Sequence, residues 1–520
     1  MPLELDLELD LPGTFNAADY FVDRNVREGR GDKVAVRCGD SRLSYAEIQA
    51  GVNRFGNTLD SLGVRMEERV ALLMLDTGLY PQAFFGTIKL GAVPVCLNTL
   101  MRPKDYEYFL NDSRARVLVI DAHLLPSLEP IRGKLHFVEH VIVVNGEAPA
   151  GDLALDDLWA DQPEQLEAAP TTPDDACFWL YSSGSTGQPK GTVHLQRDMV
   201  YSCETYGKQV LGVKEGDVCF SAAKLFFAYG LGNGLYFPFS VGATAIYLPE
   251  RPTPEAVYRT IQEQRPTIFY GVPTLYASML EAEGSLEGVR ICVSAGEALP
   301  ADILKRWRER FGVDILDGIG STELVHIFIS NYPGDINPGS TGRLVPGHEA
   351  KIVDENMQEV PQGEVGTLLV NSGSAAAYYW NKREKTRQTM LGPWLNTGDK
   401  FFMDEQGLYF YAGRTDDMLK VGGIWLSPIE VEACIISHPA VLECAVVAAT
   451  DAEDLVKPKA YVVLKSGQQE SDQLAEEIKL YVKNTLAPYK YPRWLEFIDE
   501  LPKTATGKIK RFELRKLGDS

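Results

Sequence analysis

The sequence predicts an α/β protein with two domains, and three features of its pattern support this prediction. Short apolar runs alternate with helical patterns through the first four fifths of the chain, which is typical of parallel sheets covered by helices. Glycines then separate short strand-like runs over residues 340–412, which indicates a smaller antiparallel unit. The remaining C-terminal part has a separate pattern of its own. We therefore expect a large multi-layer N-terminal domain that includes the antiparallel β unit, and a small mobile α+β C-terminal domain.

The N-terminal alternation can be followed element by element. A helix is predicted from Ser44 to Leu62, because apolar residues recur every three or four positions behind a Ser44–Glu47 capping box. Buried strands are predicted at residues 70–75, 117–120, 141–144, 243–248, 267–270 and 291–294. The acidic, proline-containing stretch over 148–175 is expected to be a surface connection.

The later elements divide the chain. Residues 367–370 are predicted to form a strand of the antiparallel unit. The C-terminal module is expected to contain a helix from about Pro428, strands at 441–448 and 460–464, and a helix at 472–486. We place the N-terminal domain at residues 1–415 and the C-terminal domain at residues 416–520.

Composition and charge exclude several classes of protein. The 520 residues carry a formal net charge of −21, which opposes general binding to nucleic acid or to anionic membranes. The first ten residues are acidic where a secretory signal is basic, and no apolar run approaches the length of a membrane span, so a cytoplasmic location is expected. The eight cysteines include no C-x-x-C pair, which gives no indication of a disulfide framework or a zinc site.

One loop gives the strongest chemical signal. Residues 181–191 read YSSGSTGQPKG and follow the apolar run 177–180, so the loop is expected at the carboxyl end of a buried strand. Glycines let the backbone approach phosphate oxygens, hydroxyls donate to them, and a lysine adds positive charge. The spacing differs from a Walker A loop, and a flexible Ser/Gly linker is the alternative. The predicted polyphosphate site consists of Ser182, Ser183, Gly184, Ser185, Thr186, Gly187 and Lys190.

Four further segments carry residue types that a nucleotide enzyme uses. Residues 317–323 end in a carboxylate beside a hydroxyl, which suits the oxygen ligands of Mg²⁺. Asp399 follows a glycine turn and suits two ribose hydroxyls. Residues 413–423 combine positive charge with glycine at the domain boundary, and Lys508 follows a turn glycine. Taken singly, these segments also fit a capped turn, a turn aspartate, a charged linker and a basic surface.

In this order and spacing, the five segments resemble the adenylate-forming superfamily of acyl-CoA synthetases, peptide-synthetase adenylation domains and luciferases, from about Ser44 to Arg511. The resemblance implies that ATP and a carboxylic acid form an acyl-adenylate and diphosphate. The C-terminal domain then rotates, and the acyl group passes to a thiol. ATP and CoA would be co-substrates, and Mg²⁺ would be the cofactor.

The resemblance also implies roles for individual residues. Lys508 matches the lysine that bridges the acyl carboxylate and the α-phosphate, Glu323 matches the Mg²⁺ ligand, and Thr186 and Lys190 match the phosphate contacts, with Thr186 also beside the metal. Asp399 and Arg414 would hold the ribose. Adenine would be flanked by Ala295, Gly296, Glu297, Asp317, Gly318, Ile319 and Gly320, and the nucleotide site would also include Ser321 and Thr322. Many relatives have tyrosine where this chain has Ile319, so aromatic stacking on adenine from that position is not expected.

The second half-reaction is assigned to the C-terminal domain. Asp416 matches the hinge of the family, and rotation there would withdraw Lys508. It would also present Lys420, Gly422 and Gly423 to the pantetheine arm of CoA. The run PYKYPR interleaves aromatic and basic residues, of which Tyr489, Lys490 and Arg493 are predicted CoA contacts. A turn with exposed basic residues is the structural alternative.

Three segments, KLFFAYG, DGIGSTE and APYKYPR, together look like those of benzoate–CoA ligases. On that resemblance the aryl pocket is lined by Ala228, Tyr229, Ala295, Gly320, His326 and Ile327. Small residues would leave room for a ring, and His326 would polarise or orient a ring substituent. A core aromatic patch with a hydrogen-bonded histidine explains the same residues without a ligand.

The predicted function is an AMP-forming ligase that converts benzoate, ATP and CoA to benzoyl-CoA, AMP and diphosphate. One alternative is a CoA ligase for 4-hydroxybenzoate, 2-aminobenzoate or a medium-chain fatty acid, because one ring substituent changes specificity by only ~1–3 kcal/mol. Others are an adenylation enzyme that serves a carrier protein and a non-catalytic sensor that binds an acyl-adenylate. No nucleic-acid or membrane partner is expected, and both a monomer and a homodimer are compatible with the sequence.

Overall fold

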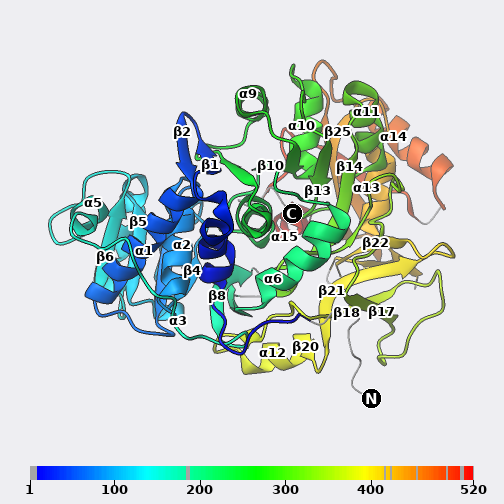
Figure 1. Ribbon diagram of the computed structural model, residues 1–520. Coiled ribbons are helices and arrows are strands. Elements are labelled where there is room, and N and C mark those ends of the chain that lie inside the picture. The colour runs from blue at the N-terminus through cyan, green and yellow to red at the C-terminus, as the bar shows by residue number, and fades with distance from the viewer. Residues whose placement is uncertain are drawn as a thin grey trace.

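The computed structural model describes residues 9–182, 188–414, 417–421, 424–451, 455–487, 490–503 and 509–518, and it leaves out the side chains of residues 420, 424, 425 and 518. Two large sheets form the body of the N-terminal part (Figure 1). The nine-stranded sheet has the order β16 (Arg343–Leu344), β15 (Ile327–Ser330), β14 (Ile315–Gly320), β13 (Ile291–Ser294), β12 (Ile268–Gly271), β10 (Val218–Ser221), β11 (Thr244–Tyr247), β1 (Val34–Cys38), β2 (Ser41–Ser44).

The second sheet has eight strands. Its order is β19 (Tyr378–Tyr379), β9 (Lys190–Leu195), β8 (Ala176–Ser182), β4 (Val93–Cys96), β3 (Arg69–Leu73), β5 (Val117–Asp121), β6 (His140–Val144), β7 (Leu153–Ala154). In both sheets the central strands are parallel, while β2, β9, β15, β16 and β19 pair antiparallel at the edges.

The cores on the two faces of each sheet show how the layers stack. Val70 and Leu72 of β3 pack into one cluster together with residues of α1, α2 and the nine-stranded sheet, whereas Leu73 packs with α3 on the opposite face. In β10, Cys219 faces the shared cluster and Phe220 packs against α9–α11. This period of two places helices outside both sheets and between them, as expected for buried parallel strands.

The helices run as follows. The α-helices are α1 (Tyr45–Ser61), α2 (Leu79–Lys89), α3 (Pro103–Ser113), α4 (Leu125–Leu128), α5 (Leu155–Trp159), α6 (Asp198–Ser202), α7 (Ala228–Leu231), α8 (Phe237–Val241), α9 (Pro254–Gln264), α10 (Pro273–Glu281), α11 (Ala301–Phe311), α12 (Arg383–Thr389), α13 (Pro428–Ile436), α14 (Asp472–Thr485) and α15 (Arg511–Gly518). Short 3₁₀ or π turns are η1 (Asp19–Asp23), η2 (Val26–Arg30), η3 (Ala122–Leu124), η4 (Glu129–Lys134), η5 (Cys203–Val210), η6 (Gly232–Tyr236) and η7 (Thr322–Leu324). No helix in the described part of the chain has the length and apolar character of a membrane-spanning segment.

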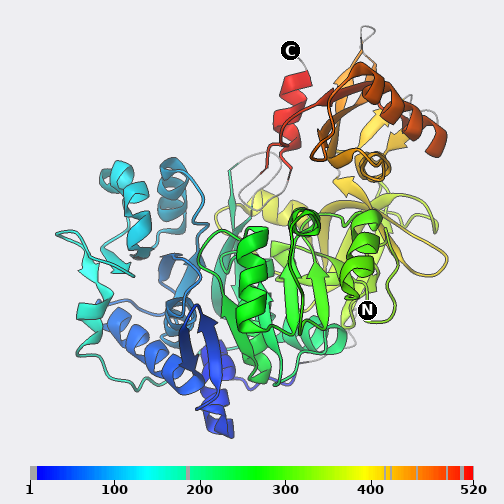
Figure 2. The same ribbon diagram turned by 90° about the horizontal axis from the view of Figure 1, so that it is seen from above.

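The remaining strands form smaller sheets. An antiparallel sheet joins β17 (His348–Val353), β18 (Gly366–Ser372), β21 (Trp394–Met403), β20 (Met390–Leu391) and β22 (Tyr409–Arg414). The C-terminal part contains the pair β23 (Leu419–Val421) and β24 (Ile424–Leu426), and the sheet β25 (Val441–Thr450), β26 (Val456–Leu464) and β27 (Trp494–Phe497). Figure 2 shows this part, in orange to red, on one side of the larger body.

The predicted fold class is confirmed, and so are its elements. The capping box of α1 is present, with the Ser44 side chain accepting from the Glu47 N–H. The six predicted N-terminal strands and the C-terminal helices and strands all form within a few residues of their expected bounds. The stretch 148–175 is not only a connection, because β7 and α5 lie within it and β7 extends the eight-stranded sheet.

Candidate active site

The predicted polyphosphate loop joins two strands of the eight-stranded sheet. β8 runs parallel to β4 and ends at Ser182, which confirms the expected position at a strand's carboxyl end. The chain returns antiparallel as β9, and Ser182 is the register partner of Lys190. Lys190 therefore belongs to a strand rather than to the loop. Ser183, Gly184, Ser185, Thr186 and Gly187 lie outside the described residues.

Glu323 faces this hairpin from the other large sheet, just after β14. One carboxylate oxygen, Oε1, accepts hydrogen bonds from Ser182 Oγ at 3.0 Å and from Tyr379 Oη at 2.7 Å. Lys190 Nζ lies 4.0 Å from the same oxygen, 3.4 Å from Tyr379 Oη and 4.4 Å from the centre of the Tyr379 ring. The structure thus brings three predicted residues, Ser182, Lys190 and Glu323, into one cluster.

The charges in this cluster are set by burial and by each other. Burial opposes ionisation of Glu323, but the Lys190 ammonium and the hydrogen bonds from Tyr379 and Ser182 outweigh it, so the net direction of its pKa is downward. Burial lowers the pKa of Lys190, and Glu323 opposes that effect. The cluster holds a carboxylate beside an ammonium group, and both side chains are 14% exposed.

The residues at the cluster suit a metal ion that arrives with a nucleotide. Among the described residues, no group of three or more His, Cys, Asp or Glu side chains converges to hold a metal alone. Glu323 supplies one carboxylate and Ser182 a hydroxyl at 3.0 Å from it. Mg²⁺ is commonly held by one or two carboxylates together with phosphates and water, so this donor set fits it.

Asp399 and Arg414 are brought together. They are register partners in β21 and β22, and Arg414 Nη1 lies 3.0 Å from Asp399 Oδ1. Asp399 raises the pKa of Arg414 above its ordinary value. Asp399 was expected after a glycine turn, but it lies inside a strand at a register shift, where Gly398 adopts a φ of +72°. Such a bulge redirects a side chain without ending the strand.

The two segments predicted to flank adenine lie on neighbouring strands. Ala295, Gly296 and Glu297 follow β13, and Asp317–Gly320 form the end of β14, which is parallel to β13. Burial raises the pKa of Asp317 well above its ordinary value. Ile319 packs against the core of the antiparallel unit. Ser321 and Thr322 follow in an extended residue and a 3₁₀ turn rather than in a capped helix.

The C-terminal part contacts this region directly. The backbone N–H of Ile509 donates to a Glu297 carboxylate oxygen at 3.0 Å. Ile509 is adjacent to Lys508, which itself lies outside the described residues. The chain beside the predicted catalytic lysine therefore meets the loop after β13.

The predicted aryl-pocket residues are partly placed by contacts. The Tyr229 hydroxyl donates towards the Gly271 and Val293 carbonyls at 3.2 and 3.0 Å, and its ring centre lies 5.5 Å from that of His326. Gly320 and Ile327 are register partners between β14 and β15. A Cβ on Gly320 would lie 2.6 Å from the His326 carbonyl oxygen, so glycine is required there by close packing. Ala228 begins α7, and Ala295 is buried beyond β13.

His326 is a neutral residue in this structure. Its Nε2 faces the Asn233 Oδ1 at 3.0 Å and the Tyr229 carbonyl at 3.3 Å, so this nitrogen must carry the proton. Burial lowers its pKa to about 3. Its Nδ1 has no hydrogen-bond partner among the described residues. A charged interaction with a ring substituent near neutral pH is therefore not available to His326.

The predicted hinge and CoA residues are only partly described. Asp416, Gly422, Gly423 and Tyr489 lie outside the described residues, and Lys420 is placed by its backbone in β23. Lys490 forms an ion pair with Glu430 at 2.6 Å, and the Arg493 guanidinium lies 4.5 Å from the centre of the Tyr491 ring.

Tyr379 is a site residue that the sequence did not reveal. It lies in the two-residue strand β19, which pairs with β9 so that Tyr379 stands opposite Thr192. Nothing in the run around it resembles a nucleotide-binding segment, and only the sheet pairing brings its hydroxyl to Glu323.

Comparison with known proteins finds two family models that together match most of the chain. A family model described as AMP-binding enzyme matches residues 22–380, and a second, described as AMP-binding enzyme C-terminal domain, matches residues 430–508. A benzoate–CoA ligase of Thauera aromatica is 53% identical over 98% of this chain and 97% of the relative.

Two solved structures have the same architecture. An anthranilate CoA ligase in complex with anthranoyl-AMP matches with a TM-score of 0.95 and 48% identity, covering 98% of both chains. A benzoate CoA ligase from Burkholderia xenovorans LB400 matches with a TM-score of 0.90 and 49% identity, covering 96% of this chain and 100% of the other.

Proposed function

The chain belongs to the AMP-binding enzyme family, and on that basis we propose that it is an AMP-forming acid–thiol ligase that converts benzoate, ATP and CoA to benzoyl-CoA, AMP and diphosphate. One observation carries the proposal: Ser182, Lys190 and Glu323 converge at a hairpin whose loop has the residue types of a polyphosphate site. ATP and CoA are co-substrates. Mg²⁺ is the proposed cofactor; Glu323 and Thr186 would hold it with ATP, and it would neutralise phosphate charge.

In the first half-reaction, a benzoate oxygen bonds to the α-phosphorus of ATP while the bond from that phosphorus to the bridging oxygen of diphosphate breaks. Negative charge accumulates on phosphate oxygens, so positioned cations and donors supply most of the acceleration. We assign this role to Lys190 and Lys508. The contact between Ile509 and Glu297 supports an orientation in which Lys508 approaches the nucleotide. Asp399 and Arg414 would hold the ribose.

In the second half-reaction, the CoA thiolate attacks the benzoyl carbonyl carbon and AMP leaves with the electron pair of the broken bond. We propose that residues 416–520 rotate as a domain about Asp416 against residues 1–415. The separate C-terminal family match over 430–508 supports this division. Rotation would withdraw Lys508 from the active site and bring the segment from Lys420 to Gly423 to it. Tyr489, Lys490 and Arg493 would contact CoA.

Benzoate is the proposed acid, and 2-aminobenzoate is the second candidate because an anthranilate CoA ligase is 48% identical and covers nearly the whole chain. Ala228, Tyr229, Ala295, Gly320, His326 and Ile327 would line the pocket. A neutral His326 offers no charge to a substituent, which is compatible with an unsubstituted ring. The shape of the pocket would decide whether 4-hydroxybenzoate or a medium-chain fatty acid binds as well as benzoate.

The test is a product assay with purified protein, ATP, Mg²⁺ and CoA across benzoate, 2-aminobenzoate, hydroxybenzoates and octanoate. Benzoate should give the highest kcat/KM, with one AMP and one diphosphate per benzoyl-CoA. The Lys508→Ala variant should lose adenylation yet still form benzoyl-CoA from supplied benzoyl-AMP. A preference for another acid would replace benzoate in the proposal, and equal loss in both assays would remove the rotation model.

A further inference from the structure

A buried histidine ties the strand of the phosphate hairpin to the turn that carries Glu323. His194 lies on β9, four residues after Lys190, and its side chain is fully buried. Its Nε2 lies 2.8 Å from the carbonyl oxygen of Thr322, the residue before Glu323. A carbonyl only accepts, so Nε2 must carry a proton and donate it.

Asp198 fixes the orientation of this ring. Its Oδ2 lies 2.9 Å from His194 Nδ1 and also accepts from the Leu195 N–H at 3.0 Å. The ring of His194 stacks on Phe178 at 4.9 Å between centroids with an interplanar angle of 19°. The imidazole is therefore held on two edges and on one face, and its remaining nitrogen is directed at Thr322.

The turn that accepts the hydrogen bond from His194 is strained. Val325 adopts a φ of +68° and a ψ of −45°, and the His326 N–H donates to the Leu324 carbonyl at 2.8 Å, which closes a three-residue γ-turn. This conformation is rare, and a β-branched residue in it is a genuine outlier. Strain of this kind persists only where the surroundings enforce it.

The surroundings hold every carbonyl of the turn. The Thr322 oxygen accepts from His194, the Glu323 oxygen from the Ala376 N–H at 2.8 Å, the Leu324 oxygen from Ser374 Oγ at 3.0 Å, and the Val325 oxygen from Tyr236 Oη at 3.5 Å. The same turn places Glu323 at one end and His326 at the other. A fixed turn would therefore set both the metal-binding carboxylate and a wall of the acid pocket.

We propose that His194, oriented by Asp198, is a positioning residue that holds the Thr322–Val325 turn so that Glu323 meets the metal ion of the bound nucleotide. This role rests on the proposed function of Glu323. Among the described residues no hydrogen bond or ion pair joins His194 to Glu323, so His194 would act through the Thr322 carbonyl.

Two matched substitutions separate this role from a structural one. In His194→Gln, the amide nitrogen takes the place of Nε2 and keeps a donor for Thr322. In His194→Asn, the shorter amide takes the place of Nδ1 and loses that donor. Both remove the ring and its stacking on Phe178, so a general loss of packing should affect them alike.

The measurement is the dissociation constant of an ATP analogue with a methylene group between the α and β phosphorus atoms, with Mn²⁺ and with the metal removed. The ratio of the metal-free constant to the Mn²⁺ constant isolates the contribution of the metal. The measurement requires neither benzoate nor turnover. We expect this ratio to fall about 10-fold in His194→Asn, as for other residues that support a metal ligand, and to stay near the wild-type value in His194→Gln.

Equal ratios in the two variants would overturn the proposal, whether both keep the metal contribution or both lose it. Should His194→Asn not fold, Asp198→Asn provides the second test. It keeps the ring but disturbs its orientation, and it should reduce the ratio; an unchanged ratio would count against the proposal. Wild-type protein that forms no benzoyl-CoA would refute the proposed function but leave this binding comparison valid.

Discussion

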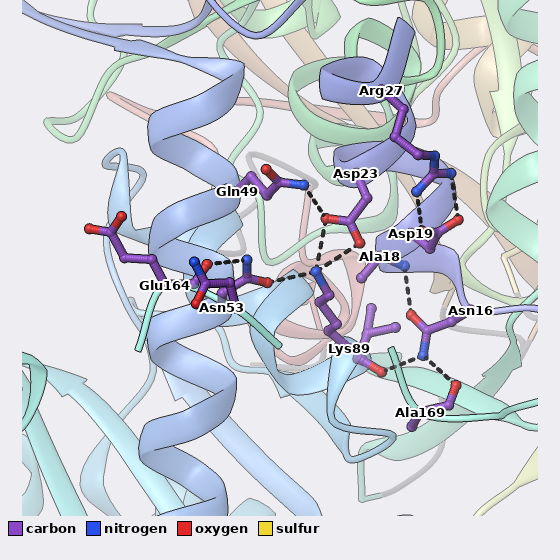
Figure 3. A network of polar contacts seen from close by, with 12 residues as sticks. Asn16, Ala18, Asp19, Asp23, Arg27, Gln49, Asn53, Lys89, Glu164 and Ala169 are labelled. Atoms are coloured by element: carbon purple, nitrogen blue, oxygen red, sulfur yellow. Dashed lines mark hydrogen bonds and ion pairs between the residues drawn. The ribbon is translucent and has the colours of Figure 1, made fainter. Parts of the chain in front are cut away.

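Two lysine–carboxylate pairs, Lys89–Asp23 and Lys190–Glu323, differ in how completely their hydrogen-bonding groups are satisfied. Lys89 Nζ lies 2.8 and 2.7 Å from the two oxygens of Asp23 and 2.6 Å from Asn53 Oδ1 (Figure 3). Gln49 donates a further hydrogen bond to Asp23 at 2.8 Å. At the candidate active site, Lys190 Nζ lies 4.0 Å from Glu323 Oε1.

The difference separates a structural pair from a functional one. The contacts of Lys89 have the length of charge-assisted hydrogen bonds, about 2.8 Å, and they join η1, α1 and α2 between the two large sheets. Lys190 stands further from Glu323 and 3.4 Å from Tyr379 Oη. Its ammonium therefore keeps binding capacity for phosphate oxygens, while that of Lys89 is used inside the fold.

The largest expected effect is on stability. Lys89→Met leaves the Asp23 carboxylate buried without its cation, which should cost about 3–5 kcal/mol of unfolding free energy. The kcat of the folded fraction should change little. Chemical denaturation and active-site titration measure the two quantities. The double variant Lys89→Met/Asp23→Asn should recover part of the loss; a double variant as unstable as the single one would contradict an unpaired charge as the cause.

The second effect is on catalysis. Glu323→Gln removes the negative charge that faces Lys190 and the nucleotide, so the rate of benzoyl-adenylate formation should fall roughly 100-fold. Its thermal midpoint should change less than that of Lys89→Met. Diphosphate release from benzoate and ATP gives the rate, with the exposed Glu309→Gln as control. Wild-type diphosphate release by Glu323→Gln would exclude Glu323 from the site.

A smaller effect is expected at the phenol between the two charges. Tyr379→Phe removes the 2.7 Å hydrogen bond to Glu323 but keeps the ring beside Lys190. A hydrogen bond to a charged group contributes about 1.5–3 kcal/mol, so the apparent affinity for Mg²⁺–ATP should fall about 10-fold or more. The neighbouring Tyr378→Phe, at an exposed position, should leave this affinity unchanged. Equal affinities of the two variants would remove Tyr379 from the site.

The effect that is smallest near neutral pH is a pH dependence of stability. The pKa of His326 is lowered from 6.5 to about 3 in the folded chain, so the unfolded chain binds the proton first. Its contribution to stability is fully present above about pH 6.5 and is lost as the pH falls towards 3, with a slope of at most about 1.4 kcal/mol per pH unit. Denaturation of His326→Gln between pH 7 and 5 should show a shallower slope than wild type. An identical slope would show that His326 takes up a proton in the folded chain.

The sequence predicted most of the fold because its signals are local. The Ser44 capping box, the apolar run before Ser182 and the alternation of strands with helices each depend on residues close in the chain. The segments with Lys190, Glu323 and Asp399 were also visible, because their residue types and order resemble a known family.

The rest depends on contacts between distant residues. Tyr379 reaches Glu323 only because β19 pairs with β9, and His194 reaches Thr322 across 128 positions of the chain. The positive φ of Val325 could not be predicted from the sequence, because valine normally avoids that conformation. The sequence around Gly398 predicts a turn where the structure has a bulge, because glycine is common to both.

The most direct test of adenylation by this protein is to incubate the wild-type protein with benzoate, ATP and Mg²⁺ in the absence of CoA and to identify the products by mass spectrometry. Benzoyl-AMP and diphosphate should form in equal amounts, only with benzoate present, and both should be strongly reduced in Glu323→Gln. Formation of ADP and phosphate, or equal diphosphate release by Glu323→Gln, would contradict this prediction.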